Sequence, residues 1–88
     1  MSRAQYLSDN NFLNIDAKLK NDSNLAGFEV VNVTRQQLNG YNYIITYQNQ
    51  QGTTIVYDIY VTLMGDITVN GTSSNQQPQQ TISTNKPN

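Results

Sequence analysis

The chain has 88 residues, a formal net charge of −1, and neither cysteine nor histidine. This length is enough for one domain but not for two, and the missing residue types exclude a disulfide and a typical zinc site. The few charged residues form no Lys/Arg cluster and the apolar runs are short, which argues against binding to nucleic acid or membranes. The fold must therefore be stabilised by packing and hydrogen bonds alone.

The first predicted element is a short helix near the N-terminus. Ser8 or Asp9 can cap its first turn and the polar run at 21–24 ends it, which gives a helix over about residues 9–20. Its apolar residues recur at spacings of three and four and form one stripe: Phe12, Ile15 and Leu19. A helix of this length is marginal alone in water, so we expect it to pack against a sheet.

Strand-like segments follow the helix, at residues 28–35, 41–48, 53–63 and 67–69. One face of the third segment is apolar and consists of Ile55, Tyr57, Ile59, Val61 and Leu63. Its other face is mixed and consists of Val56, Asp58, Tyr60 and Thr62. Such alternation is typical of an antiparallel sheet that is covered on one face, so we predict an α+β fold, a helix packed across a four-stranded antiparallel sheet. The residues expected to share its core are Phe12, Leu19, Tyr43, Ile45, Tyr57 and Ile59.

The composition changes after Gly71. Residues 72–88 consist of Thr, Ser, Asn, Gln, Pro and Lys, with Ile82 as the only large aliphatic residue. Such a segment buries too little apolar surface to offset its ordering entropy, which predicts a disordered polar tail. The predicted organisation is one domain over residues 1–71 and a tail over residues 72–88.

No pattern of catalytic residues is visible in the sequence. Histidine is absent, which removes Ser-His and Cys-His chemistry, and the glycines lie in separate turns rather than in a phosphate loop. The carboxylates are scattered along the chain: Asp9, Asp16, Asp22, Glu29, Asp58 and Asp66. We therefore expect no enzyme, no cofactor and no metal.

The most informative stretch joins the first two predicted strands. It is Gln36-Gln37-Leu38-Asn39-Gly40, followed by Tyr41-Asn42-Tyr43-Ile44-Ile45. Gly40 can adopt a positive φ and so close a tight hairpin. With these residues the chain resembles the cystatin family of cysteine-protease inhibitors, whose first hairpin carries Gln-x-Val-x-Gly before a strand of the type Asn-Tyr-x-Ile. The matching residues are Gln36, Gly40, Asn42, Tyr43 and Ile45, with Leu38 in place of the valine.

The resemblance extends over residues 8–70, because the order of helix, strands and hairpins is similar to that of the family. Leu63-Met64-Gly65 stands where members of the stefin type have Leu-Pro-Gly. Two departures are those of a divergent member. The family's N-terminal Gly hinge is replaced by Arg3-Ala4-Gln5-Tyr6, and Met64 replaces a proline.

The resemblance implies inhibition without chemistry, in which an N-terminal trunk and two hairpins form a wedge that fills the active-site cleft of a papain-like protease. The implied contact residues are Gln36, Gln37, Leu38, Asn39 and Gly40 in the first loop, Leu63, Met64 and Gly65 in the second, and Arg3, Ala4, Gln5 and Tyr6 in the trunk. Leu38 and Met64 would be exposed apolar residues at hairpin tips, which suits insertion into a groove. Gly40 would let the protease wall approach the backbone closely.

Other interpretations of the same residues stay open. Residues 36–40 can be no more than the hairpin that the fold needs, and Leu63 can be the last core residue of its strand with Met64 tucked beneath the loop. The alternative function is a non-inhibitory module of the same fold that serves assembly or binding through low-charge sheet edges. We expect a monomer, with association through sheet edges as the other option. The first residues hold no hydrophobic signal segment, so we expect a cytoplasmic protein, or a secreted one if the chain is a processed fragment.

Overall fold

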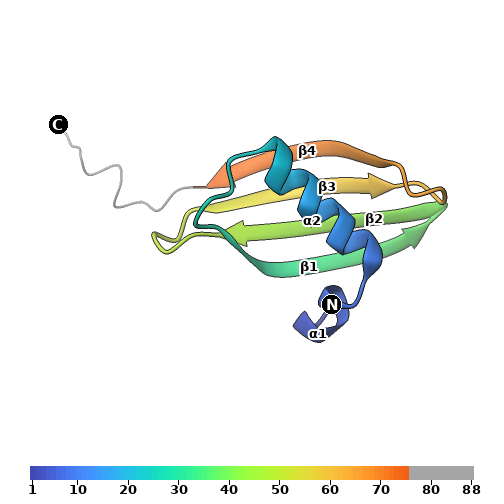
Figure 1. The fold of residues 1–88 in the computed structure, drawn as a ribbon, viewed down its shortest axis with the longest axis horizontal. Coiled ribbons are helices and arrows are strands. Elements are labelled where there is room, and N and C mark those ends of the chain that lie inside the picture. The colour runs from blue at the N-terminus through green and yellow to red at the C-terminus, as the bar shows by residue number, and fades with distance from the viewer. Residues whose placement is uncertain (76–88) are drawn as a thin grey trace.

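The computed structural model describes residues 1–75 and confirms the predicted fold class. One long helix lies across one face of a sheet whose four strands run antiparallel in the order β1-β2-β3-β4 (Figure 1). Among residues 1–75, no helix lies on the other face of the sheet. The elements are α1 (Arg3–Leu7), α2 (Asn10–Asp22), β1 (Glu29–Leu38), β2 (Gly40–Gln48), β3 (Thr54–Val61) and β4 (Ile67–Asn75).

The helix α2 begins at the predicted cap. Its N-cap is Asp9, whose carboxylate accepts hydrogen bonds from the backbone N–H groups of Asn11 and Phe12 at 2.9 and 3.3 Å. This arrangement satisfies two of the donors that a helix leaves unpaired at its start. The helix ends two residues later than predicted, where the backbone N–H of Ser23 donates to the carbonyl of Leu19. The three residues of the predicted stripe, Phe12, Ile15 and Leu19, are all buried.

The helix α1 was not predicted. Ser2 and Gln5 cap it reciprocally, because the Ser2 hydroxyl accepts from the Gln5 backbone and the Gln5 side chain accepts from the Ser2 backbone. Tyr6 is buried against Phe12, with ring centroids 5.0 Å apart. The segment expected to act as an N-terminal trunk is therefore folded into a helix and anchored to the core by Tyr6.

The core lies between α2 and the inner face of the sheet, as predicted. Tyr43 pairs with Ile59 and Ile45 pairs with Tyr57 across β2 and β3, and all four side chains are buried. The tyrosines of these strands therefore pack in the sheet, as their alternation predicts. The buried apolar residues are Tyr6, Phe12, Ile15, Leu19, Leu25, Val33, Tyr43, Ile45, Tyr47, Tyr57, Ile59 and Val61.

The strand β4 corrects the predicted domain boundary at Gly71. It continues to Asn75, and residues 72–75 pair in register with the first half of β3, from Thr72 with Tyr57 to Asn75 with Thr54. The side chains of these residues are exposed and polar, so no apolar alternation in the sequence predicted a strand here. Backbone hydrogen bonds to β3 hold these residues in the sheet. The rest of the predicted tail, residues 76–88, lies outside the described residues.

Candidate functional site

The two predicted contact loops lie at the same end of the sheet (Figure 1). This follows from the antiparallel order: β1 and β3 end there, while β2 and β4 begin there. The first hairpin tip is at Leu38–Gly40 and the second is at Thr62–Asp66. We call the three exposed apolar side chains of these tips, Leu38, Leu63 and Met64, the tip surface.

The first loop is much shorter than the predicted stretch 36–40. Leu38 pairs with Gly40, so Asn39 is the only residue outside the ladder. Gln36 and Gln37 belong to β1 and pair with β2, which makes them strand residues rather than loop residues. The strand extends beyond its predicted end at residue 35. The prediction ended there because the last residues of the strand are polar and exposed, a pattern that is also typical of a loop.

Gly40 does not have the predicted role of admitting a partner to its backbone. It has a φ of +113°, as expected for a glycine in a tight hairpin, but it is buried against β3. A Cβ at this position would lie 2.5 Å from the Val61 carbonyl oxygen and 2.7 Å from the Tyr60 hydroxyl. The surface that approaches Gly40 closely is therefore the protein's own third strand.

The same contacts connect the two tips. The Tyr60 hydroxyl donates a hydrogen bond to the carbonyl of Asn39, at the turn of the first hairpin. Tyr60 and Val61 are the last two residues of β3 and directly precede the second hairpin. The position of one tip is thus fixed relative to the other by a short, packed connection.

Thr62 organises the second tip. Its carbonyl accepts from the Gly65 N–H at 2.9 Å, and its hydroxyl accepts from the N–H groups of Met64 and Asp66 at 3.3 and 3.0 Å. Its own N–H donates to the Asp66 carbonyl at 2.9 Å. Gly65 has a φ of +92°, which L side chains rarely adopt. The turn is therefore held by backbone groups and one threonine, and the side chains at its apex take no part in holding it.

The side chains of the tip surface point into solvent. Leu38 is 53% exposed, Leu63 is 73% exposed and Met64 is 91% exposed. The interpretation of Leu63 as a core residue with Met64 beneath the loop is therefore wrong. Leu63 is exposed because β3 ends at Val61, so the alternation that buries Ile59 and Val61 does not continue to Leu63.

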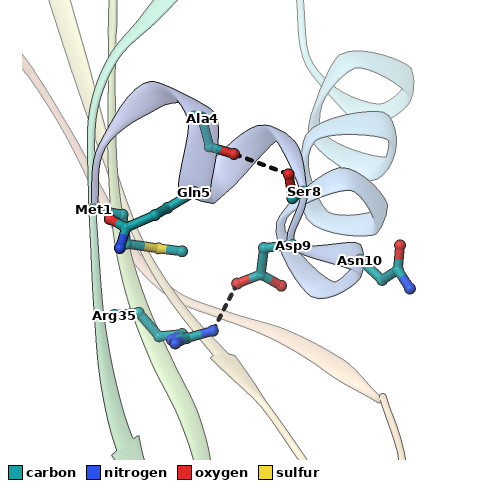
Figure 2. A pocket seen from close by; sticks show the side chains of 7 residues that line it. All are labelled: Met1, Ala4, Gln5, Ser8, Asp9, Asn10 and Arg35. Carbon is teal, nitrogen blue, oxygen red and sulfur yellow. Dashed lines mark hydrogen bonds and ion pairs between the residues drawn. The ribbon is translucent and has the colours of Figure 1, made fainter.

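The third predicted contact segment, Arg3 to Tyr6, does not join the tips. The helix α1 lies along β1 instead of at the hairpin end (Figure 1). Residues of α1, of β1 and of the start of α2 line a shallow hollow, and Figure 2 shows Arg35 directed across it at Asp9. Arg35 stands three residues before Leu38, which is about 10 Å along a strand. The residues that line this hollow are Met1, Ala4, Gln5, Ser8, Asp9, Asn10 and Arg35.

Two tyrosine–carboxylate hydrogen bonds fix α2 on the sheet. The Tyr43 hydroxyl donates to Asp9 at 2.7 Å and the Tyr47 hydroxyl donates to Asp16 at 2.6 Å. Burial of the phenol, together with the hydrogen bond and charge of Asp9, raises the pKa of Tyr43 to about 12. Burial and the Asp16 carboxylate raise the pKa of Tyr47 as well. These four residues attach α2 to the sheet whose hairpins form the tips.

The spacing of these residues in the sequence could have predicted the two tyrosine–carboxylate hydrogen bonds. Asp9 and Asp16 are seven residues apart, about two turns of helix, while Tyr43 and Tyr47 are four residues apart on one face of a strand. The two spacings correspond to about 10.5 Å along a helix and 13 Å along a strand, so the pairs can meet if the elements run side by side.

Within the described part of the chain, no three carboxylates gather as a metal site would require. No helix in residues 1–75 has the length and apolar character needed to cross a bilayer. Comparison of the chain with protein-family models, with curated proteins and with solved structures finds no match. The geometry of the two tips is therefore the main observation from which a function can be argued.

Proposed function

We propose that the chain is a reversible, non-covalent inhibitor of papain-like cysteine proteases, and that the tip surface enters the active-site cleft. The observation that supports this most directly is the exposure of Leu38, Leu63 and Met64 at one end of the sheet. Apolar side chains on a protruding end are complementary to a concave, largely apolar groove, which is the usual form of a ligand cleft. The resemblance of residues 36–45 to the first hairpin of cystatins supports the same class of target.

The hydrogen bonds around the tips favour binding without rearrangement. Thr62 fixes the second turn, and the Tyr60 hydroxyl fixes the first turn through Asn39. A binding surface that is already ordered loses little conformational entropy when it docks. The two loops would therefore enter a cleft as a single rigid edge.

The shape of the tips also explains why an inhibitor of this kind would resist cleavage. A single unpaired residue turns the chain at Asn39, and the Thr62–Gly65 hydrogen bond closes the second turn. Neither turn can lie extended along a cleft while the flanking strands keep their ladder bonds. The apolar side chains would fill the cleft, and no peptide bond would be presented in an extended conformation.

The position of α1 sets the proposed contact area. Arg3–Tyr6 is tied to the core through Tyr6 and lies along β1, so the two hairpins alone would supply the contacts. Truncation of any one of three apolar side chains should then weaken binding markedly, because small interfaces depend on a few buried residues.

The test is a titration of the protein against papain and a cathepsin-type protease, with stoichiometric loss of peptidase activity as the expected result. Leu38→Asp should weaken inhibition at least tenfold, because a charge would be buried in an apolar groove. Val31→Asp is the matched control. Val31 lies on the same strand as Leu38 and is equally exposed, 52% against 53%, but it lies near the opposite end of that strand. Equal effects of the two substitutions, or no inhibition by the wild type at micromolar concentration, would contradict the proposal.

The edge strand β4 favours a second candidate, a non-inhibitory module that binds a partner by strand addition. Along Ile67–Asn75 the strand carries no charged residue, and charge is a common protection of such edges. A partner strand could pair with the backbone groups on the outer edge of β4, which no other strand of the described residues covers. This function would be indicated if Ser73→Lys abolished partner binding while Leu38→Asp left it unchanged and no protease was inhibited.

A further inference from the structure

Met64 combines extreme exposure with a position at the apex of the second tip. It is 91% exposed, the highest value among the large apolar residues of the described chain. Its backbone N–H donates to the Thr62 hydroxyl, but the turn is closed by the Thr62–Gly65 and Thr62–Asp66 hydrogen bonds. The thioether therefore lies in solvent and is not needed to hold the turn.

The sequence leaves few other groups for an oxidant to attack. The chain contains no cysteine and no tryptophan, and its two methionines are Met1 and Met64. Met1 is partly buried and packs against the core. Because oxidation of methionine follows the exposure of its sulfur, a mild oxidant should modify Met64 first.

We propose that Met64 is a reversible oxidation site, at which a peroxide converts the tip surface from apolar to polar and so weakens binding to the protease. This inference rests on the proposed function. The thioether sulfur attacks one peroxide oxygen, an S–O bond forms as the O–O bond breaks, and the second oxygen leaves as water after proton transfer. Sulfur loses two electrons to the peroxide. A dithiol, used by a methionine sulfoxide reductase, reverses the step and becomes a disulfide while the oxygen leaves as water.

The consequence for binding follows from the chemistry of the sulfoxide. Its oxygen is a strong hydrogen-bond acceptor that is solvated at the free tip and would lose that solvation in an apolar groove. The free protein should remain folded, because Met64 lies outside the core. Oxidation should therefore weaken inhibition at least tenfold and leave the thermal midpoint unchanged.

The experiment treats the full chain with hydrogen peroxide and removes the peroxide with catalase before any protease is added. Peptide mass spectrometry locates the added oxygen, and the inhibition constant is then measured against papain. Methionine sulfoxide reductases with dithiothreitol should restore the original constant. Met64→Leu is the matched control, because it keeps the tip apolar and cannot be oxidised there. Met64→Gln should resemble the oxidised protein without treatment.

The expected result is addition of one oxygen at Met64, at least tenfold weaker inhibition by the oxidised wild type, and an inhibition constant of Met64→Leu, whatever its starting value, that is the same before and after peroxide treatment. Modification of Met1 with Met64 left intact would overturn the proposal, as would equal inhibition by reduced and oxidised wild type or an equal loss in Met64→Leu. If the untreated protein inhibits no papain-like protease, the proposed function fails and this regulation fails with it. The first three outcomes leave the inhibitor function standing, so the two failures are distinguishable.

Discussion

The Tyr43 hydroxyl donates a 2.7 Å hydrogen bond to the same Asp9 carboxylate that caps the first turn of α2. One buried carboxylate thereby connects the start of the helix to the middle of the sheet. Arg35, a residue of β1, forms an ion pair with this carboxylate, with 3.0 Å between its guanidinium nitrogen and the Asp9 oxygen. Three elements therefore meet at a single side chain. The arrangement has consequences for stability that can be measured directly.

Removal of this carboxylate should destabilise the protein strongly. Asp9→Ala deletes the cap of α2 and leaves the buried Tyr43 hydroxyl without its acceptor, which together should cost about 2–4 kcal/mol. Urea unfolding measured by circular dichroism gives the free energy. The control is Asp22→Ala, which removes an exposed pair with Lys18 and should change stability little. Similar losses in both variants would show that the Asp9 contacts contribute nothing special.

Stability should fall at alkaline pH. Burial and Asp9 raise the pKa of Tyr43 to about 12 in the folded protein, against about 10 in an unfolded chain. Above pH 10 the unfolded chain therefore loses this proton first, so the stabilisation is complete below about pH 10 and is lost as the pH rises toward 12. Urea midpoints at pH 8, 10 and 11 test this.

The matched variant for the alkaline effect is Tyr43→Phe, which has no proton to lose at this position. Its stability should be lower at pH 8 but should decline less steeply between pH 10 and 11 than that of the wild type. The Tyr47 phenol, whose pKa is also raised, still titrates in this variant, so part of the decline should remain. Parallel curves for the two proteins would contradict the assignment to Tyr43.

The two hairpin glycines should respond differently to alanine. Both have positive φ, and that strain alone should make Gly65→Ala cost about 1–2 kcal/mol. At Gly40 the added Cβ also meets the Val61 carbonyl and the Tyr60 hydroxyl, so Gly40→Ala should cost about 2–5 kcal/mol. Thermal unfolding of both variants provides the comparison. A Gly40 variant as stable as its Gly65 counterpart would show that β3 can move aside without cost.

The end of β4 should contribute to stability despite its polar sequence. A chain ending at Asn75 keeps the four pairs between residues 72–75 and β3, and a chain ending at Gly71 loses them. We expect the shorter chain to have a thermal midpoint about 5 °C lower or more, roughly a kilocalorie per mole for a domain of this size. Identical midpoints would mean that these pairs add nothing to the fold.

The core could be predicted from the sequence because its signal is strong and repeated. Tyr43, Ile45, Tyr57 and Ile59 alternate strictly, and one register alone places them all against Phe12 and Leu19. The elements that were missed carry no such pattern. Backbone pairing holds 72–75 in the sheet, and a single capping box starts the short helix α1.

The two hairpin turns were predicted from the sequence, but the conformation of the residues within them was not. Alternation along 53–63 suggested that Leu63 faces the core, yet the strand stops at Val61, and only the hydrogen bonds of Thr62 reveal where the turn begins. The role of Gly40 was misjudged for a similar reason: a positive φ can be inferred from sequence, but the neighbour that crowds a glycine depends on the register of β2 on β3.

The strand order β1-β2-β3-β4 also bears on how quickly the protein can reach this structure. Every pair of neighbouring strands is consecutive in the chain, so each hairpin can zip from its own turn without the closure of a long loop. The long-range step is the docking of α2, because its N-cap residue Asp9 binds Tyr43, which is 34 residues away in the sequence. Chains dominated by such local pairing fold faster than sandwiches of equal size. The exposed tips are the turns of two of the three hairpins, β1–β2 and β3–β4, so they would be among the first parts of the sheet to acquire their final geometry.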